Sequence, residues 1–228
     1  MTGRQKALWL AALLAVPCLL IDTSAGAQAP AGRGPRGAGA GGAPRAQHEG
    51  ASRDPSAAAA GAYKLDSDHA SIVFRILHEG TSYSTFRFYT DAGTLDWNPA
   101  QIESSKVEVT VDTKSLATPV VNFADRLTGE HYLNSAKFPQ ARFVSTGIRR
   151  TGPTAGEITG DLTLLGVTKP LVVEADLVGV GPNARGVPTV GFKGVAKLKR
   201  SDFGLMTLLP SIADEVELQI DIEFNRQG

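Results

Sequence analysis

The sequence has a single cysteine, no excess of either charge and no run of 18 apolar residues. One cysteine excludes an intrachain disulfide framework, and the short apolar runs exclude a multi-pass helical membrane protein. The 23 basic and 23 acidic side chains balance, so the whole chain gives no electrostatic case for a nucleic-acid partner. The apolar fraction of 42% is close to the globular average, and part of the chain can therefore form a core.

Residues 1–27 have the pattern of an export signal. Two basic residues precede an apolar run over 7–21, and Ala25-Gly26-Ala27 before Gln28 matches a small-residue cleavage site. An uncleaved anchor is the alternative, but the run is short for a membrane span. We therefore expect cleavage near Ala27-Gln28 and a periplasmic or otherwise exported protein. Cys18 lies in the apolar run, so its removal would leave no thiol for a metal site.

Residues 28–62 are mostly Ala, Gly and Pro and contain no aromatic, Val, Leu, Ile or Met residue. Such a composition predicts a disordered linker ahead of a folded part over 63–228. Two G-x-G-x-x-G matches occur in the linker, but neither follows a strand or opens a helix, so neither indicates a dinucleotide site. Its four arginines could contact phosphates, although a plain tether is the simpler interpretation.

Alternation of apolar and polar residues dominates the folded part. It is clearest over 216–224, where Val, Leu, Ile, Ile and Phe interleave with polar residues, and it recurs over 107–111 and 72–78. Further strands are expected at about 141–146, 157–165, 171–178 and 190–200, with a short connection over 166–170. Only 122–135 breaks the period, which indicates a short helix or two.

At least eight short strands with turns between them predict an all-β antiparallel barrel or sandwich, and closure would leave no open sheet edge. Several inner positions are small, among them Gly160, Gly194 and Ala196. Small inner residues leave room for a ligand inside a barrel of about eight strands. They could equally mark bends or the close approach of another segment. Spacing alone leaves these two interpretations open.

The folded part resembles a known family in several spaced blocks. They are Tyr63-Lys64-Leu65-Asp66, His69, Phe74, His78, Gly80, Phe138-Pro139-Gln140-Ala141-Arg142-Phe143, Ser145-Thr146, Gly160 to Pro170, Gly191-Phe192, Arg200 to Gly204 and Asp214-Glu215-Val216. These blocks resemble the YceI-like family, the exported lipocalin-like proteins associated with polyisoprenoid binding. The chain departs from the family pattern at Ala70, Glu79, Thr85 and Asp125-Arg126-Leu127.

The resemblance implies an eight-stranded antiparallel lipocalin-like β-barrel with a short helical insertion. It also implies an apolar tunnel that holds an isoprenoid chain, such as a quinone tail or a prenyl phosphate. The expected ligand is therefore an isoprenoid lipid or quinone, with no other cofactor and no metal. Transient contact with a membrane surface is the other expected interaction, and the oligomeric state stays open.

Strand parity and the resemblance together select twelve candidate ligand-binding residues. They are Phe74, Ile76, His78, Phe86, Phe88, Phe143, Leu162, Leu164, Phe192, Leu198, Arg200 and Phe203. For each aromatic residue the alternative is ordinary core packing. Arg200 could clamp a phosphate or quinone oxygen, or pair with a carboxylate such as Asp202. A buried His78 could contact the ligand or simply satisfy a local hydrogen bond.

Catalysis has little support in the sequence. No H-E-x-x-H or G-x-S-x-G motif occurs, and the spacings of His69, His78 and His131 match no standard zinc site. The favoured function is an exported, non-catalytic carrier of an isoprenoid lipid. The alternatives are an extracytoplasmic hydrolase or isomerase that uses His78, and a stress-induced scaffold whose barrel is filled.

Overall fold

The computed structural model describes residues 51–228 as ten strands, one short α-helix and five short 3-10 helices. The expected signal and most of the expected linker lie outside the described residues. Within 51–228, no helix has the length and apolar character needed to cross a membrane. The strands are β1 (Gly61–Leu65), β2 (Ser71–His78), β3 (Ser82–Phe88), β4 (Thr90–Trp97), β5 (Lys106–Asp112), β6 (Gln140–Arg150), β7 (Ala155–Leu164), β8 (Val167–Pro182), β9 (Pro188–Lys199) and β10 (Ile212–Arg226).

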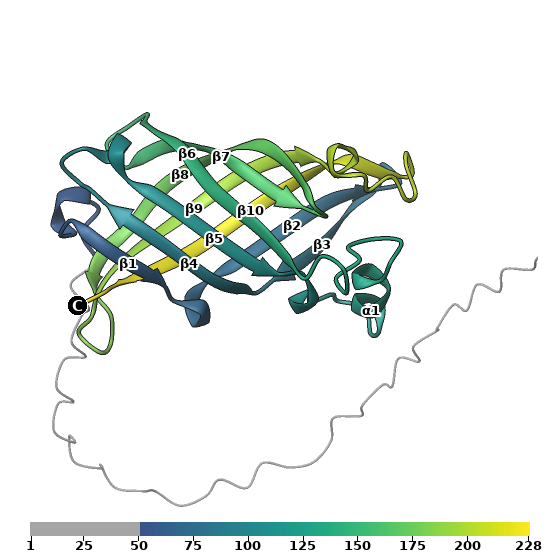
Figure 1. The fold of residues 1–228 in the computed structure, drawn as a ribbon, viewed down its shortest axis with the longest axis horizontal. Helices are drawn as coiled ribbons and strands as arrows, with labels where there is room; N and C mark the ends of the chain where they lie inside the picture. The colour runs from purple at the N-terminus through teal and green to yellow at the C-terminus, as the bar shows by residue number, and fades with distance from the viewer. Residues whose placement is uncertain (1–50) are drawn as a thin grey trace, which may run out of the picture. The chain divides into compact units, whose positions relative to one another are not determined.

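The strands close into an antiparallel barrel (Figure 1). Eight of them form the ring in the order β1-β4-β5-β6-β7-β8-β9-β10, and β1 closes it by pairing with β10. The long β10 pairs with β2 over Ile212 to Asp221 and with β1 over Phe224 to Arg226. A 3-10 turn at Ser67–His69 separates β1 from β2, which therefore share one edge of β10. The expected eight-stranded antiparallel barrel is confirmed.

Side chains alternate between the barrel interior and solvent as the sequence predicts. On β10, Val216, Ile222 and Phe224 are buried, while Gln219 and Asp221 between them are exposed. The connection between β7 and β8 is shorter than expected. It is a two-residue turn in which Leu165 and Gly166 both have positive φ, 53° and 74°. Strand β8 consequently starts early, at Val167.

One half of the barrel is filled, and we call it the packed half. Phe74 packs against two other rings. The centroid of its ring lies 5.0 Å from that of Phe86 and 5.2 Å from that of Phe88. The insertion between β5 and β6 contains the expected helix, α1 (Phe123–Thr128), and its Phe123 ring lies 6.2 Å from that of Phe86. Leu116, Leu127 and Leu133 of the same insertion complete this cluster. Figure 1 shows α1 at one end of the barrel, beside β3.

The segment 51–62 corrects the linker prediction, because it is ordered against the barrel. Ser52 exchanges backbone hydrogen bonds with Val180 on β8, at 2.9 and 2.7 Å. Asp54 caps the 3-10 helix Pro55–Ala57 by accepting a bond from the Ser56 amide. Ala58 is only 3% exposed and belongs to a core cluster. Backbone pairing thus holds a segment that lacks large apolar side chains.

Candidate functional site

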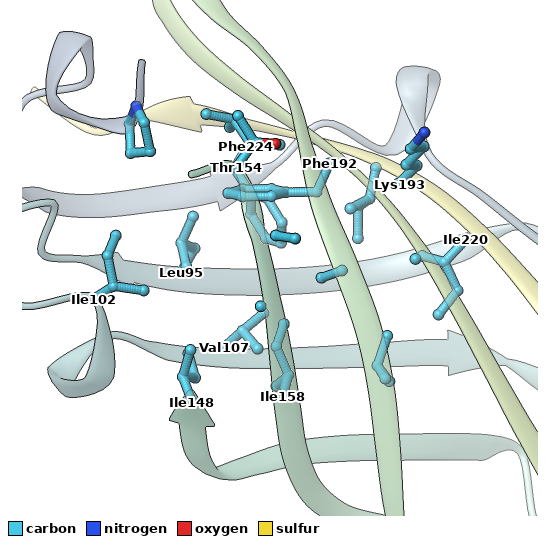
Figure 2. A pocket seen from close by; sticks show the side chains of 18 of the residues that line it. Leu95, Ile102, Val107, Ile148, Thr154, Ile158, Phe192, Lys193, Ile220 and Phe224 are labelled. Carbon is cyan, nitrogen blue, oxygen red and sulfur yellow. The ribbon is translucent and has the colours of Figure 1, made fainter. Parts of the chain in front are cut away.

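The other half of the barrel encloses a cavity, and we call it the hollow half (Figure 2). The division runs along β10: Val216 belongs to the packed half, whereas Ile220, Ile222 and Phe224 line the cavity. Space between the lining side chains totals about 970 Å³ with the open mouth included. About 140 Å³ of it admits the centre of a water molecule. The cavity is therefore narrow and continuous with solvent.

The cavity lining is almost entirely apolar. It is formed by Pro55, Leu95, Trp97, Ile102, Val107, Val109, Phe143, Ile148, Arg150, Pro153, Thr154, Ala155, Gly156, Ile158, Val173, Ala175, Leu177, Phe192, Lys193, Gly194, Ile220, Ile222 and Phe224. Only Arg150, Thr154 and Lys193 bring a charge or a hydroxyl group, and only Trp97 brings a further polar hydrogen. Such a lining is suited to a hydrocarbon chain or ring and gives no polar cage for a charged group.

Two of the twelve predicted residues, Phe143 and Phe192, line this cavity. The other ten lie elsewhere in the fold. Phe74, Ile76, Phe86, Phe88 and Leu198 belong to the packed half, and Leu162 packs with Leu171 and Val173 in a third cluster. Leu164 and His78 stand at strand ends, Phe203 is buried in the 3-10 helix Arg200–Phe203, and Arg200 begins that helix.

Sequence reasoning missed most of the lining on β4, β5, β6 and β8. Val107 and Val109 carried a signal, because the alternation over 107–111 placed them on one face of a strand. Leu95 and Trp97 on β4 and Ile148 on β6 show the same alternation in the structure. Parity alone assigns these residues to the interior, but it does not separate a hollow section from a filled one.

The small inner residues divide between the two interpretations that spacing left open. A Cβ added at Gly160 would overlap the Phe143 ring and lie 2.5 Å from the Val144 carbonyl oxygen. Gly160 therefore permits a close approach of the ring. Gly194 lines the cavity, and a Cβ there would lie 3.0 Å from a Val173 methyl group and in ordinary contact, at 3.6 Å, with the Glu174 carbonyl oxygen and the Ile220 Cβ. Gly194 thus contributes to the free space.

A network of charged groups lies at the rim of the cavity, close to the segment 51–62. Arg53 donates to both carboxylate oxygens of Asp176 at 3.0 and 3.1 Å and to the Thr154 hydroxyl at 3.3 Å. The Lys193 ammonium lies 3.4 Å from the same carboxylate. The hydrogen bond with Thr154 and the charges of Arg53 and Lys193 hold the pKa of Asp176 below its usual range. Both cations are thus paired with Asp176 within the chain, and the three groups together keep one net positive charge.

Arg150, the remaining cation of the lining, is also partnered. Its Nε donates to the Gly152 carbonyl at 2.8 Å and its Nη2 to the Pro153 carbonyl at 2.7 Å. Both acceptors belong to the connection between β6 and β7. Arg150 therefore holds that turn in shape rather than presenting a free guanidinium to the cavity.

Arg200 corrects the expectation of a ligand clamp. It is only 7% exposed, and its guanidinium donates four hydrogen bonds of 2.7–2.8 Å to the carbonyls of Leu205, Thr207, Ile212 and Ala213. These four carbonyls engage the hydrogen-bond donors of the guanidinium without Asp202 or a ligand. Burial lowers the pKa of Arg200, although the charge of Asp214 opposes this effect. Its role is to fold the connection between β9 and β10.

The structure does not gather the three histidines. His78 ends β2 opposite Ile212, and His131 lies exposed after α1. His69 instead joins Asp66 and Glu223, the one group of three metal-ligating side chains close together within 51–89 and 92–228. Asp66 already accepts hydrogen bonds from the Asn225 side chain and the Asp68 amide, so it serves as a local cap.

Comparison with known proteins agrees with this architecture. The model of a family described as a YceI-like domain matches residues 63–224. Protein YceI of Escherichia coli O157:H7 is 42% identical over 171 residues, which cover 73% of this chain and 87% of the relative. The solved Campylobacter jejuni YceI protein is 28% identical with a TM-score of 0.60, covering 67% of this chain and 90% of that one.

A more distant solved structure shares the fold. It is described as a polyisoprenoid binding domain from Saccharophagus degradans and is 13% identical, with a TM-score of 0.55. The match covers 72% of this chain and 98% of that one. At this identity the likeness concerns the barrel architecture alone.

Proposed function

Because the chain belongs to the YceI-like domain family, we propose that it is an exported binding protein that carries an isoprenoid lipid in its barrel. The apolar cavity of the hollow half is the observation that carries this proposal. The description of the Saccharophagus degradans neighbour as polyisoprenoid-binding agrees with it. The signal pattern over 1–27 supports export to the periplasm.

The chemistry of the lining supports an isoprenoid. Each buried CH₂ group contributes about 0.8 kcal/mol, so a few isoprene units provide ample driving force before ordering costs are subtracted. Branched and aromatic side chains such as Ile158, Val173 and Phe143 suit a methyl-branched chain, because the lining and the lipid both present irregular apolar surfaces. The proposal requires binding and release only, with no bond made or broken.

The packed half limits how much of the lipid the barrel can hold. The Phe74, Phe86 and Phe88 rings already occupy the interior beyond the cavity. A long polyisoprenoid would therefore place part of its chain in the hollow half. The remainder would pass through the mouth, where the 3-10 helix Pro55–Ala57 and the β6–β7 connection lie.

Native mass spectrometry of the protein purified from its own cell envelope tests the proposal. We expect an added lipid mass that disappears on organic extraction. Saturating quinone or prenyl phosphate should also raise the melting temperature, because a ligand that binds only the folded state stabilises it. A lipid-free mass together with an unchanged melting curve for both ligands would contradict the proposal.

Filling the cavity provides a matched test by mutation. Gly194→Leu places a branched side chain in the cavity beside Val173 and Ile220, and we expect it to abolish lipid uptake. Gly147→Leu is the control, because Gly147 lies exposed on β6 with open space at its Cβ position. Circular dichroism should show the barrel intact in both variants. Equal lipid uptake by the two would exclude this cavity as the site.

A further inference from the structure

Trp97 is the one buried side chain with a polar hydrogen in the wall of the cavity. It ends β4, where it pairs with Gly61 of β1, and it is only 6% exposed. Its ring meets that of Phe192 edge to face, with centroids 5.7 Å apart. Both residues line the cavity. The indole is therefore buried and bordered by the space that the ligand would occupy.

The indole N–H of Trp97 has no hydrogen-bond acceptor. Among the side chains described, those of 51–89 and 92–228, Trp97 Nε1 and Ser135 Oγ are the only buried polar atoms that lack a partner, and Ser135 does not line the cavity. Buried polar groups almost always find a partner, and an indole nitrogen can act only as a donor. The missing acceptor is thus expected to enter the cavity from outside.

We propose that Trp97 Nε1–H donates a hydrogen bond to a neutral oxygen of the bound lipid. The inference rests on the proposed function and narrows its ligand class. The surroundings of Trp97 are apolar, since Leu95, Leu177 and Phe224 belong to the same core cluster. A single neutral donor in such surroundings suits a carbonyl or hydroxyl oxygen, as in a quinone or a prenyl alcohol.

A phosphate would fit this position poorly. An ionised group loses far more hydration on burial than one neutral hydrogen bond restores. The cations nearest the cavity are already engaged, Arg53 and Lys193 with Asp176 and Arg150 with two carbonyls. A prenyl phosphate would therefore have to keep its charge outside the cavity and leave the Trp97 N–H unsatisfied.

Binding of lipids that share one tail and differ only at the head tests the proposal. The full chain and its Trp97→Phe variant would be titrated with a prenylated quinone, a prenyl alcohol, a prenyl phosphate and a plain isoprenoid hydrocarbon. Loss of one hydrogen bond predicts about tenfold weaker binding of the quinone and the alcohol. We expect less than a twofold change for the hydrocarbon and the phosphate. Phe192→Leu is the control, and it should weaken all four alike.

The indole proton gives a direct readout of the contact. The chain has two tryptophans, Trp9 and Trp97, and the Trp97→Phe spectrum identifies the indole signal that belongs to Trp97. In the unchanged protein that signal should move downfield with the quinone or the alcohol and stay nearly constant with the hydrocarbon.

Several outcomes would overturn the proposal. An equal loss for all four lipids in Trp97→Phe would show that the indole acts by packing alone. An unmoved indole signal with the quinone and the alcohol bound would show that no ligand oxygen accepts from it. A loss confined to the phosphate would replace the neutral oxygen with a charged one. If the unchanged protein binds none of the lipids, the proposed function itself fails.

Discussion

The packed and hollow halves of the barrel share β9 and β10 and show the same alternation, yet only one of them is filled. In the packed half, three phenylalanines from β2 and β3 meet Phe123 from the insertion. In the hollow half, the inner positions of β7, β8 and β9 include Gly156, Ala175 and Gly194. The volume of the inner side chains, rather than the strand pattern, therefore decides where the barrel holds a cavity.

The insertion explains why the packed half needs more than strands. Strand β3 pairs with β2 along its length, but its other edge has only the bridge between Arg87 and Ala117, which belongs to the insertion. The wall is therefore incomplete at this point. Residues 116–133 of the insertion cover it and place apolar side chains against the phenylalanine cluster. The hollow half has a continuous wall from β4 to β10 and receives no such filling.

Truncating one ring in each half gives the largest expected contrast. Phe86 is 8% exposed and contacts Phe74 and Phe123, so Phe86→Ala removes a well-packed ring and leaves a cavity. We expect a loss of about 3–5 kcal/mol in the free energy of unfolding. Phe192→Ala should cost less, about 1–2 kcal/mol, because its ring already borders free space.

Urea denaturation of both variants, combined with lipid titration, checks this contrast. Phe86→Ala should retain most of the lipid affinity of the unchanged protein, since it leaves the hollow half intact. Phe192→Ala should weaken binding despite its smaller effect on stability. Equal losses of stability in the two variants would show that the halves are packed alike.

Two glycines give a finer contrast with the same substitution. Gly160→Ala brings a methyl group into the Phe143 ring and against the Val144 backbone, so we expect a loss of about 1–3 kcal/mol. Gly194→Ala meets one Val173 methyl group, which has the cavity to move into, and should cost less than 1 kcal/mol. Thermal unfolding of the pair measures the difference. A reversed order would mean that Gly160 faces the free space.

Much of the fold could be predicted from the sequence because alternation is a local property. The apolar residues of the alternation over 216–224 form the inner face of β10, and the period break over 122–135 contains α1. The resemblance supplied the strand number. The order of segment 51–62 could not be predicted, because Ser52 and Arg53 are held by backbone and carboxylate groups of β8, more than 120 residues away.

The site was harder to predict than the fold. Parity correctly placed Phe74 and Phe86 inside the barrel, but whether they border space depends on Phe123, which comes from a distant insertion. Arg200 has the residue type of a phosphate clamp, yet it donates to four carbonyls from the β9–β10 connection and the start of β10. Neither arrangement could be foreseen, because sequence spacing carries no information on which groups compete for a side chain.

The smallest expected effect on stability comes from the pair of Asp66 and His69, which lies where β1 of the hollow half leads to β2 of the packed half. Asp66 follows β1 and His69 precedes β2, with the His69 Nδ1 atom 3.2 Å from the Asp66 carboxylate. The hydrogen bond to Asp66, with the charges of Asp66, Glu223 and Asp68, raises the pKa of His69. A raised pKa in the folded state means that protonated His69 stabilises the fold below its unfolded pKa of about 6.5. This contribution is lost as the pH rises through the folded value.

His69→Gln should therefore lower the melting temperature slightly at about pH 5.5 and leave it unchanged at about pH 8.5. The effect stays small because the His69 side chain is 61% exposed and solvent screens its ion pair. His131→Gln serves as the control, since His131 is an exposed histidine on the insertion and should shift neither value. Thermal unfolding at both pH values distinguishes the outcomes. A decrease of equal size at both would mean that His69 joins β1 to β2 by packing rather than by charge.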